Sequence, residues 1–140
     1  MAAQSISIST DASVLVVDDT PMVLTMMSSL LLGAGIRHVV TANCIQSALD
    51  KLPLLDKCPF NAVFLDRYLG QECGHEVLKV IVARYKASVP VIMLTKEDAA
   101  NKIIESINLG ARDYIVKPFN EETVITKLEQ VLGVELNKRL

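Results

Sequence analysis

Short apolar runs rich in β-branched residues recur along this chain, and longer amphipathic stretches separate them. The runs predict buried strands at residues 14–17, 38–42, 62–65, 91–94 and 113–116. The stretches between and after them predict helices at residues 21–32, 45–55, 76–86, 98–109 and about 121–132. Buried strands that alternate with helices are typical of a parallel sheet with helices on both faces. Right-handed crossovers make such a sheet doubly wound, so the sequence predicts an α/β fold.

The chain has 140 residues and a formal net charge of −2, which fits a single domain. It has no basic stripe that would bind nucleic acid and no run of about 20 apolar residues that would span a membrane. Residues 1–10 contain no Lys or Arg, unlike a secretory signal. We expect a flexible arm at 1–10, one domain at 11–133 and a short tail at 134–140. The dispersed cysteines Cys44, Cys58 and Cys73 fit a reducing cytoplasm.

Polar residues stand directly after four of the five predicted strands. Asp18 and Asp19 follow the first strand, Asp66 the third, Thr95 the fourth and Lys117 the fifth. In a parallel sheet of order 2-1-3-4-5 these four strands are neighbours, and ligands bind beyond their carboxyl ends. The five side chains are therefore expected to converge at one edge of the sheet.

Such a set of side chains suits phosphoryl transfer. Three carboxylates in one cleft repel one another, and Mg²⁺ relieves this repulsion because it binds carboxylates, waters and a phosphate oxygen. An aspartate can act as a nucleophile and form an aspartyl-phosphate. A lysine can hold phosphoryl oxygens as a point charge, and a threonine hydroxyl can donate to the same group. His38 and His75 have no suitable partner nearby in the sequence, so surface or packing roles are expected for them.

These positions together resemble the receiver domains of two-component response regulators. That family carries an acidic pair after the first strand, Asp after the third, Ser or Thr after the fourth and Lys-Pro after the fifth. The corresponding stretches are Val16-Val17-Asp18-Asp19, Phe64-Leu65-Asp66, Met93-Leu94-Thr95 and Val116-Lys117-Pro118-Phe119, with Gly74 eight residues after Asp66. The resemblance spans about residues 12 to 133. It implies the flavodoxin-like (βα)5 fold with strand order 2-1-3-4-5, similar to single-domain chemotaxis regulators.

The resemblance also implies a role for each residue. Asp66 would accept the phosphoryl group, Asp19 and Asp66 would bind Mg²⁺ directly, Asp18 would bind it largely through water, and Tyr68 would add its carbonyl. Lys117 and Thr95 would contact the phosphoryl group, Tyr114 would rotate inward, and the bond before Pro118 would be cis. The donor would be a histidine kinase or a histidine phosphotransfer protein. The output would be contact with a downstream protein through the fourth helix, fifth strand and fifth helix, and receivers of this family often form homodimers.

Some residues near the expected site modify the family pattern. Lys96 follows Thr95 where the family usually has a small residue, and we expect it to slow phosphoryl entry or exit or to pair with a site carboxylate. Gly70 stands where proline is common, so this part of a loop at 67–74 is expected to be flexible. Tyr68 is expected to overhang the pocket and shield an acyl phosphate from water.

Two other functions fit parts of this pattern. A degenerate receiver would keep the fold as a constitutive docking module, with Lys96 in place of a charge change caused by phosphorylation. A phosphatase of the haloacid-dehalogenase type also uses Asp on a doubly wound fold, but it needs an Asp-x-Asp motif after the first strand. Here the two acids are adjacent, and the length leaves no room for a cap domain. We therefore expect a signalling switch that catalyses only its own phosphorylation and dephosphorylation.

Overall fold

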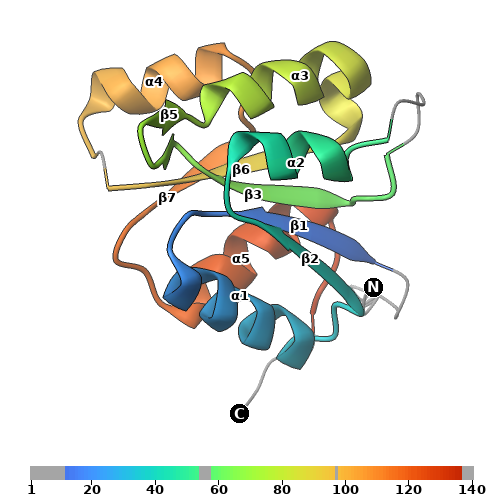
Figure 1. The fold of residues 1–140 in the computed structure, drawn as a ribbon. Coiled ribbons are helices and arrows are strands. Elements are labelled where there is room, and N and C mark those ends of the chain that lie inside the picture. Colours follow the sequence, from blue (N-terminus) through green and yellow to red (C-terminus); the bar gives the residue numbers. More distant parts are fainter. Residues whose placement is uncertain (1–11, 54–57, 97, 137–140) are drawn as a thin grey trace.

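The computed structural model describes residues 12–53, 58–96 and 98–136 and shows a layered α/β architecture (Figure 1). Its main sheet has five parallel strands in the order β2-β1-β3-β6-β7. These strands are β1 (Ser13–Val17), β2 (His38–Ala42), β3 (Ala62–Asp66), β6 (Val91–Thr95) and β7 (Asp113–Val116). The strands β4 and β5 lie outside this sheet, so β6 and β7 are its fourth and fifth strands along the chain. The spatial order is then 2-1-3-4-5, and the predicted topology is confirmed.

Helices cover both faces of the sheet. On one face lie α1 (Pro21–Gly33) and α5 (Glu121–Leu132), and on the other lie α2 (Ile45–Lys51), α3 (His75–Tyr85) and α4 (Ala100–Asn108) (Figure 1). A short 3-10 helix, η1 (Lys86–Ser88), follows α3. Two predicted bounds were wrong. The second helix ends at Lys51 because Leu52 precedes Pro53 and is extended, and the fourth begins at Ala100 because Ala99 is extended.

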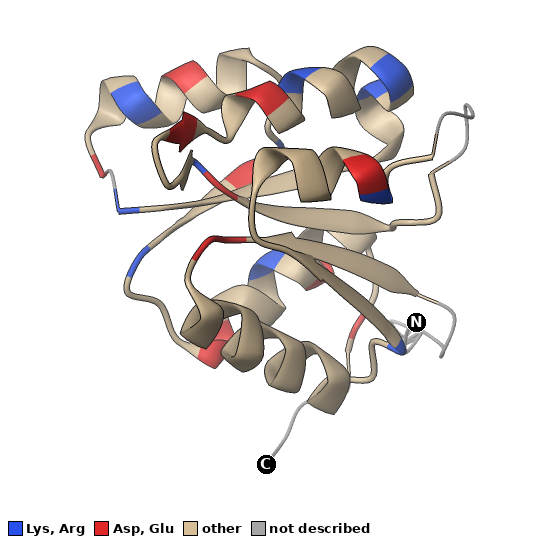
Figure 2. Cartoon of the chain, in the orientation of Figure 1, with Lys and Arg blue, Asp and Glu red and all other residues tan. Residues whose placement is uncertain are grey.

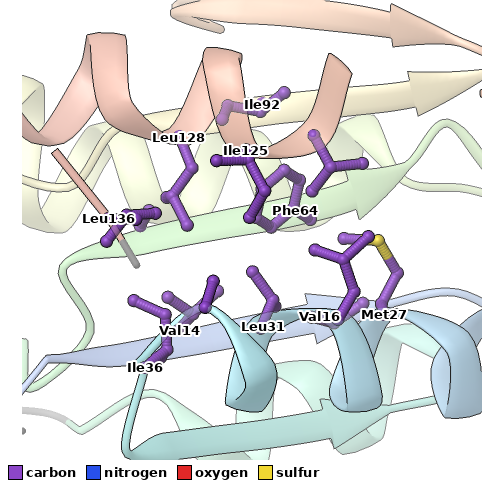
Figure 3. Packing of buried hydrophobic residues seen from close by; sticks show 14 of the residues in the cluster. Val14, Val16, Met27, Leu31, Ile36, Phe64, Ile92, Ile125, Leu128 and Leu136 are labelled. Carbon is purple, nitrogen blue, oxygen red and sulfur yellow. The ribbon is translucent and has the colours of Figure 1, made fainter. Parts of the chain in front are cut away.

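Each face of the sheet has its own apolar core, because successive side chains of a strand point to opposite faces. Val14 and Val16 of β1 pack toward α1 and α5, whereas Leu15 and Val17 pack toward α2 and α3. Figure 3 shows the first core, in which side chains of α1 and α5 meet those of β1, β3 and β6. Because helices cover both faces of the sheet, polar residues of the strands reach solvent mainly at the strand ends.

A short antiparallel ribbon occupies most of the segment that was predicted as a loop at 67–74. Its strands are β4 (Tyr68–Leu69) and β5 (Glu72–Cys73). The two-residue turn between them begins at Gly70, whose φ is 66°. Tight hairpin turns of this kind require a positive φ, which glycine adopts without steric cost. The prediction of a loop over the whole of 67–74 was therefore wrong, because residues 68–69 and 72–73 pair as strands and Gly70 begins the turn between them.

The ends of the described chain add little to the sheet. Leu136, beyond α5, is buried against the α1–α5 core, and its N–H donates to Oε2 of Glu129 at 2.9 Å. The arm predicted at residues 1–10 lies outside the described residues. No helix in the described ranges combines the length and the apolar character needed to cross a membrane.

Candidate functional site

An open cavity of about 330 Å³ lies beyond the carboxyl ends of β1, β3, β6 and β7. Its lining residues are Asp19, Thr20, Asp66, Tyr68, Gly70, Lys96 and Lys117. They follow four separate strands, and they bring together Asp19, Asp66 and Lys117 as the strand order predicts, whereas Asp18 and Thr95 are not among the lining residues. Acidic and basic segments meet at this edge of the sheet in Figure 2. The cavity therefore has a mixed charge that suits an anionic ligand held beside a cation.

Three carboxylates gather at this cavity, and two of them, Asp19 and Asp66, line it. Asp18, Asp19 and Asp66 each offer one oxygen, and these oxygens all lie within 4.8 Å of one another. Asp18 is fully buried and Asp66 is 6% exposed, whereas Asp19 is open to solvent. A hard divalent cation with oxygen ligands fits such a group, and Mg²⁺ favours a few carboxylates completed by waters. The residues present therefore fit the predicted magnesium site.

Lys117 supplies the positive charge opposite these carboxylates. Its Nζ donates to Oδ2 of Asp18 at 2.7 Å and to Oδ2 of Asp66 at 3.0 Å. The peptide bond between Lys117 and Pro118 is cis, as the family resemblance implied. One ammonium group thus bridges the ends of β1 and β3 from the far side of β6.

These contacts shape the ionisation of the site. Burial raises the pKa of the Asp66 carboxyl, and the hydrogen bond and charge of Lys117 oppose this rise. Burial alone would lower the pKa of Lys117, but hydrogen bonds to Asp18 and Asp66 outweigh it and leave that pKa raised. The lysine is therefore held as a cation, and it favours the carboxylate form of Asp66, which is the nucleophilic form.

Backbone N–H groups orient the remaining carboxylate oxygens. Oδ1 of Asp18 accepts from the N–H of Thr20 at 2.8 Å, and Oδ1 of Asp66 accepts from the N–H of Tyr68 at 3.2 Å. Oδ2 of Asp19 accepts from the N–H of Gly70 at 2.9 Å, which ties the ribbon to the end of β1. This last contact cannot be predicted from local sequence patterns, because it joins residues 51 positions apart.

Thr20 is a lining residue that sequence reasoning missed. It stands at the start of α1, but its side chain makes no capping hydrogen bond. Instead, Thr20 is exposed and lines the cavity. Its position directly after the acidic pair is the signal that could have identified it.

The other predicted site residues divide into two groups. Lys96 and Tyr68 line the cavity, and both are exposed, so they lie at its mouth as expected. Thr95 is buried at the end of β6, and its carbonyl accepts from the Lys117 N–H at 2.7 Å. Tyr114 does not line the cavity. It is half-buried on β7, and the ammonium of Lys127 lies 5.9 Å from its ring centroid.

Comparisons with known proteins agree with this geometry. A family model described as "Response regulator receiver domain" matches residues 14–129. The chain is 33% identical over 119 residues to the chemotaxis protein CheY-3 of Vibrio cholerae, a match that covers 84% of this chain and 89% of that protein. It is 34% identical over 128 residues to an NtrX-like response regulator of Rickettsia bellii. That second match covers 90% of this chain but only 26% of the relative, so the chain spans about a quarter of that protein.

Solved structures show the same fold. The chemotaxis protein CheY4 of Vibrio cholerae aligns with a TM-score of 0.76 at 36% sequence identity. The alignment covers 86% of this chain and 98% of that chain. The family model matches most of the chain, and the match to CheY-3 covers most of both proteins. The fold is also that of CheY4. The chain therefore belongs to the response regulator receiver domain family, whose members act in two-component signalling.

Proposed function

We propose that this chain is a phosphorylation switch in which Asp66 accepts a phosphoryl group in the presence of Mg²⁺. One observation carries the proposal. Three carboxylates lie within 4.8 Å of one another, and Nζ of Lys117 lies 3.0 Å from Asp66, at the wall of an open cavity. An ion pair with a purely structural role would need neither the third carboxylate nor the opening to solvent.

The proposed reaction is a transfer between two nucleophiles. A carboxylate oxygen of Asp66 attacks the phosphorus of a phosphohistidine, the P–N bond breaks, and its electron pair leaves with the imidazole. The product is a mixed anhydride, and attack by water on this aspartyl phosphate returns the carboxylate and inorganic phosphate. Mg²⁺ would offset the charge of the phosphoryl oxygens, held there by Asp19 and Asp66 directly and by Asp18 through water. The Tyr68 carbonyl would be a further ligand.

Lys117 and Thr95 would bind the phosphoryl group itself. The ammonium of Lys117 already lies beside Asp66, so it can hold a phosphoryl oxygen with little movement. Thr95 ends the neighbouring strand, and its carbonyl accepts from the Lys117 N–H at 2.7 Å, which places this residue at the same edge of the sheet. Tyr114, on the next strand, would follow any displacement of Thr95.

The donor would be a histidine kinase or a histidine phosphotransfer protein in the cytoplasm. Helix α1 begins next to Thr20 at the cavity and contains no charged residue. It exposes Met22 and Met26, whose exposed fractions are 79% and 40%, and such an apolar surface suits docking of a protein donor. The output would be contact with a downstream protein through α4, β7 and α5. A phosphatase-type enzyme is not favoured, because the family consists of signalling modules.

Binding of beryllofluoride tests this proposal. Beryllofluoride binds a carboxylate oxygen as a mimic of a phosphoryl group, and ¹⁹F NMR distinguishes the bound from the free form. We expect bound resonances with the wild-type chain in the presence of Mg²⁺, and none without Mg²⁺ or with Asp66→Asn. A wild-type chain that gives no bound signal at high Mg²⁺ would contradict the switch and favour the constitutive docking module.

A further inference from the structure

Arg67 follows the proposed phosphoacceptor directly, and its side chain runs to α4 and not to the cavity. The residue is 6% exposed, which is rare for an arginine. Its Nη2 donates to the carboxylate of Glu105, and its Nη1 donates to the carbonyl of Lys102 at 3.2 Å. Both acceptors lie on α4, which packs beside α3 on the same face of the sheet (Figure 1). A single guanidinium therefore holds two successive turns of this helix.

A second polar contact from α3 reaches the same face of α4. Nε2 of His75 lies 2.8 Å from Oγ of Ser106, and its Nδ1 lies 3.7 Å from the Glu105 carboxylate. Ser106 is the one buried residue of α4. The apolar side chains of Ile104 and Ile107 are instead 55% and 41% exposed. Polar contacts therefore hold α4 in place where most helices rely on apolar burial.

The backbone of Arg67 is fixed on both sides. Its N–H donates to the carbonyl of Leu94 on β6 at 3.0 Å, and its carbonyl accepts from the N–H of Gly74 at 2.5 Å. The neighbouring Asp66 is thus joined to α4 through a short, well-anchored path.

We propose that Arg67 is a positioning residue that holds α4 in place while Asp66 is unmodified. This inference rests on the proposed function of Asp66. A phosphoryl group on Asp66 changes the charge at the residue directly before Arg67, and a shift of this backbone segment toward the new group draws the guanidinium away from Glu105. The contact with Glu105 then weakens, and α4 with its exposed Ile104 and Ile107 is free to move. Arg67 thus couples the charged cavity at Asp66 to the exposed apolar surface of α4 that Ile104 and Ile107 form.

Thermodynamic linkage makes this coupling measurable. If the contact between Arg67 and Glu105 stabilises only the unmodified state, it weakens the binding of beryllofluoride, which favours the modified state. Removal of the contact must then tighten the binding of beryllofluoride. Glu105→Ala removes the contact at a half-exposed helical position, so the fold should tolerate it. Glu76→Ala is the matched control, because Glu76 is 61% exposed on α3 and pairs only with Lys79 at 3.4 Å among the described residues.

The experiment combines two readouts on these variants. Titration with beryllofluoride at saturating Mg²⁺ measures affinity, and we expect Glu105→Ala to bind at least about fivefold more tightly than wild type. Hydrogen exchange of α4 in the protein without metal or beryllofluoride should be faster in the same variant. Glu76→Ala should change neither quantity. Arg67→Met combined with Glu105→Ala should bind at least as tightly as Glu105→Ala alone, because the first change also removes the contact with the Lys102 carbonyl, and weaker binding would contradict the coupling.

The outcomes separate the inference from the proposed function. If wild type fails to bind beryllofluoride, the switch itself is contradicted and the coupling fails with it. If wild type binds and Glu105→Ala binds with equal affinity, the coupling alone is overturned, even if exchange of α4 is faster. That second result would leave Arg67 with a structural role. Should Arg67→Met fail to fold, the comparison of Glu105→Ala with Glu76→Ala still decides between these outcomes.

Discussion

Gly74 and Asp66 are in direct backbone contact at the start of α3. A Cβ atom built on Gly74 would lie 2.0 Å from the carbonyl oxygen of Asp66, a distance that no real side chain tolerates. The φ of Gly74 is −61°, so the requirement for glycine here is one of space and not of backbone conformation. The position of the proposed nucleophile therefore depends on a glycine eight residues further along the chain.

This contact predicts that Gly74→Ala destabilises the fold strongly. The added methyl group must displace the backbone of Asp66 or the start of α3, and we expect a loss of about 2 to 4 kcal/mol in the free energy of unfolding. Gly70→Ala is the control, because Gly70 has a φ of 66° but open space around it. Its expected cost is about 1 to 2 kcal/mol from the backbone conformation alone. Urea denaturation measures both, and equal losses would contradict the close contact.

The carboxylate group predicts that Mg²⁺ stabilises the chain. A cation that binds only the folded state raises the free energy of unfolding, by about 2.7 kcal/mol at a hundredfold excess over its dissociation constant. Thermal unfolding with and without MgCl₂, at matched ionic strength, measures this effect. Asp19→Asn should remove most of it and still accept the Gly70 N–H, since an amide oxygen replaces the carboxylate. An unchanged melting temperature in Mg²⁺ would argue against the metal site.

Lys96 predicts an effect on the lifetime of the phosphoryl group. Its exposed side chain lines the mouth of the cavity, where it can obstruct water on its way to the acyl phosphate. Lys96→Ala should therefore lose its phosphoryl group severalfold faster than wild type, as measured by the decay of the phosphorylated mass. Lys79→Ala, which removes an exposed lysine on α3, is the control for net charge. Identical decay rates in all three proteins would rule out this role for Lys96.

His75 predicts a pH dependence of stability below neutrality. Burial lowers the pKa of His75, and the charge of Arg67 lowers it further, against smaller opposing effects of Glu105 and Glu76. The unfolded chain then binds a proton more readily than the folded one. This contribution to the free energy of unfolding is complete above the unfolded pKa of 6.5 and is lost as the pH falls through and below it.

Urea unfolding between pH 7.5 and 5.5 tests this behaviour. The slope due to one histidine cannot exceed about 1.4 kcal/mol per pH unit. His75→Gln removes the titrating group and retains a hydrogen-bonding side chain opposite Ser106, so its stability should vary less over this range. Equal slopes in the two proteins would assign the pH dependence to another group.

The strands and most of the site could be predicted from the sequence because both depend on local patterns. An apolar run fixes a strand, and the residue that follows it lies at the sheet edge whatever the rest of the chain does. Asp18, Asp66 and Lys117 meet at this edge for this reason. Their convergence then required only the order of the strands, which follows from right-handed crossovers and from the family resemblance.

Contacts between side chains far apart in the chain could not be predicted from these local patterns. Arg67 and Glu105 are 38 positions apart, and nothing in their local sequence distinguishes them from solvent-exposed charges. His75 was expected in a surface or packing role, and its contact with Ser106 shows that it packs. Gly70 was interpreted as a source of flexibility, although the same positive φ that permits flexibility also permits a tight hairpin. These features depend on how elements pack, and periodicity alone does not contain that information.

The intact mass of the protein after incubation with acetyl phosphate tests the role of Asp66 most directly. With Mg²⁺ present, wild type should gain the mass of one phosphoryl group. No gain is expected when Mg²⁺ is removed by a chelator, and none in Asp66→Asn. A wild-type chain that gains no mass at any time after mixing, or an Asp66→Asn variant that gains as much as wild type, would contradict the assignment of Asp66 as the phosphoacceptor.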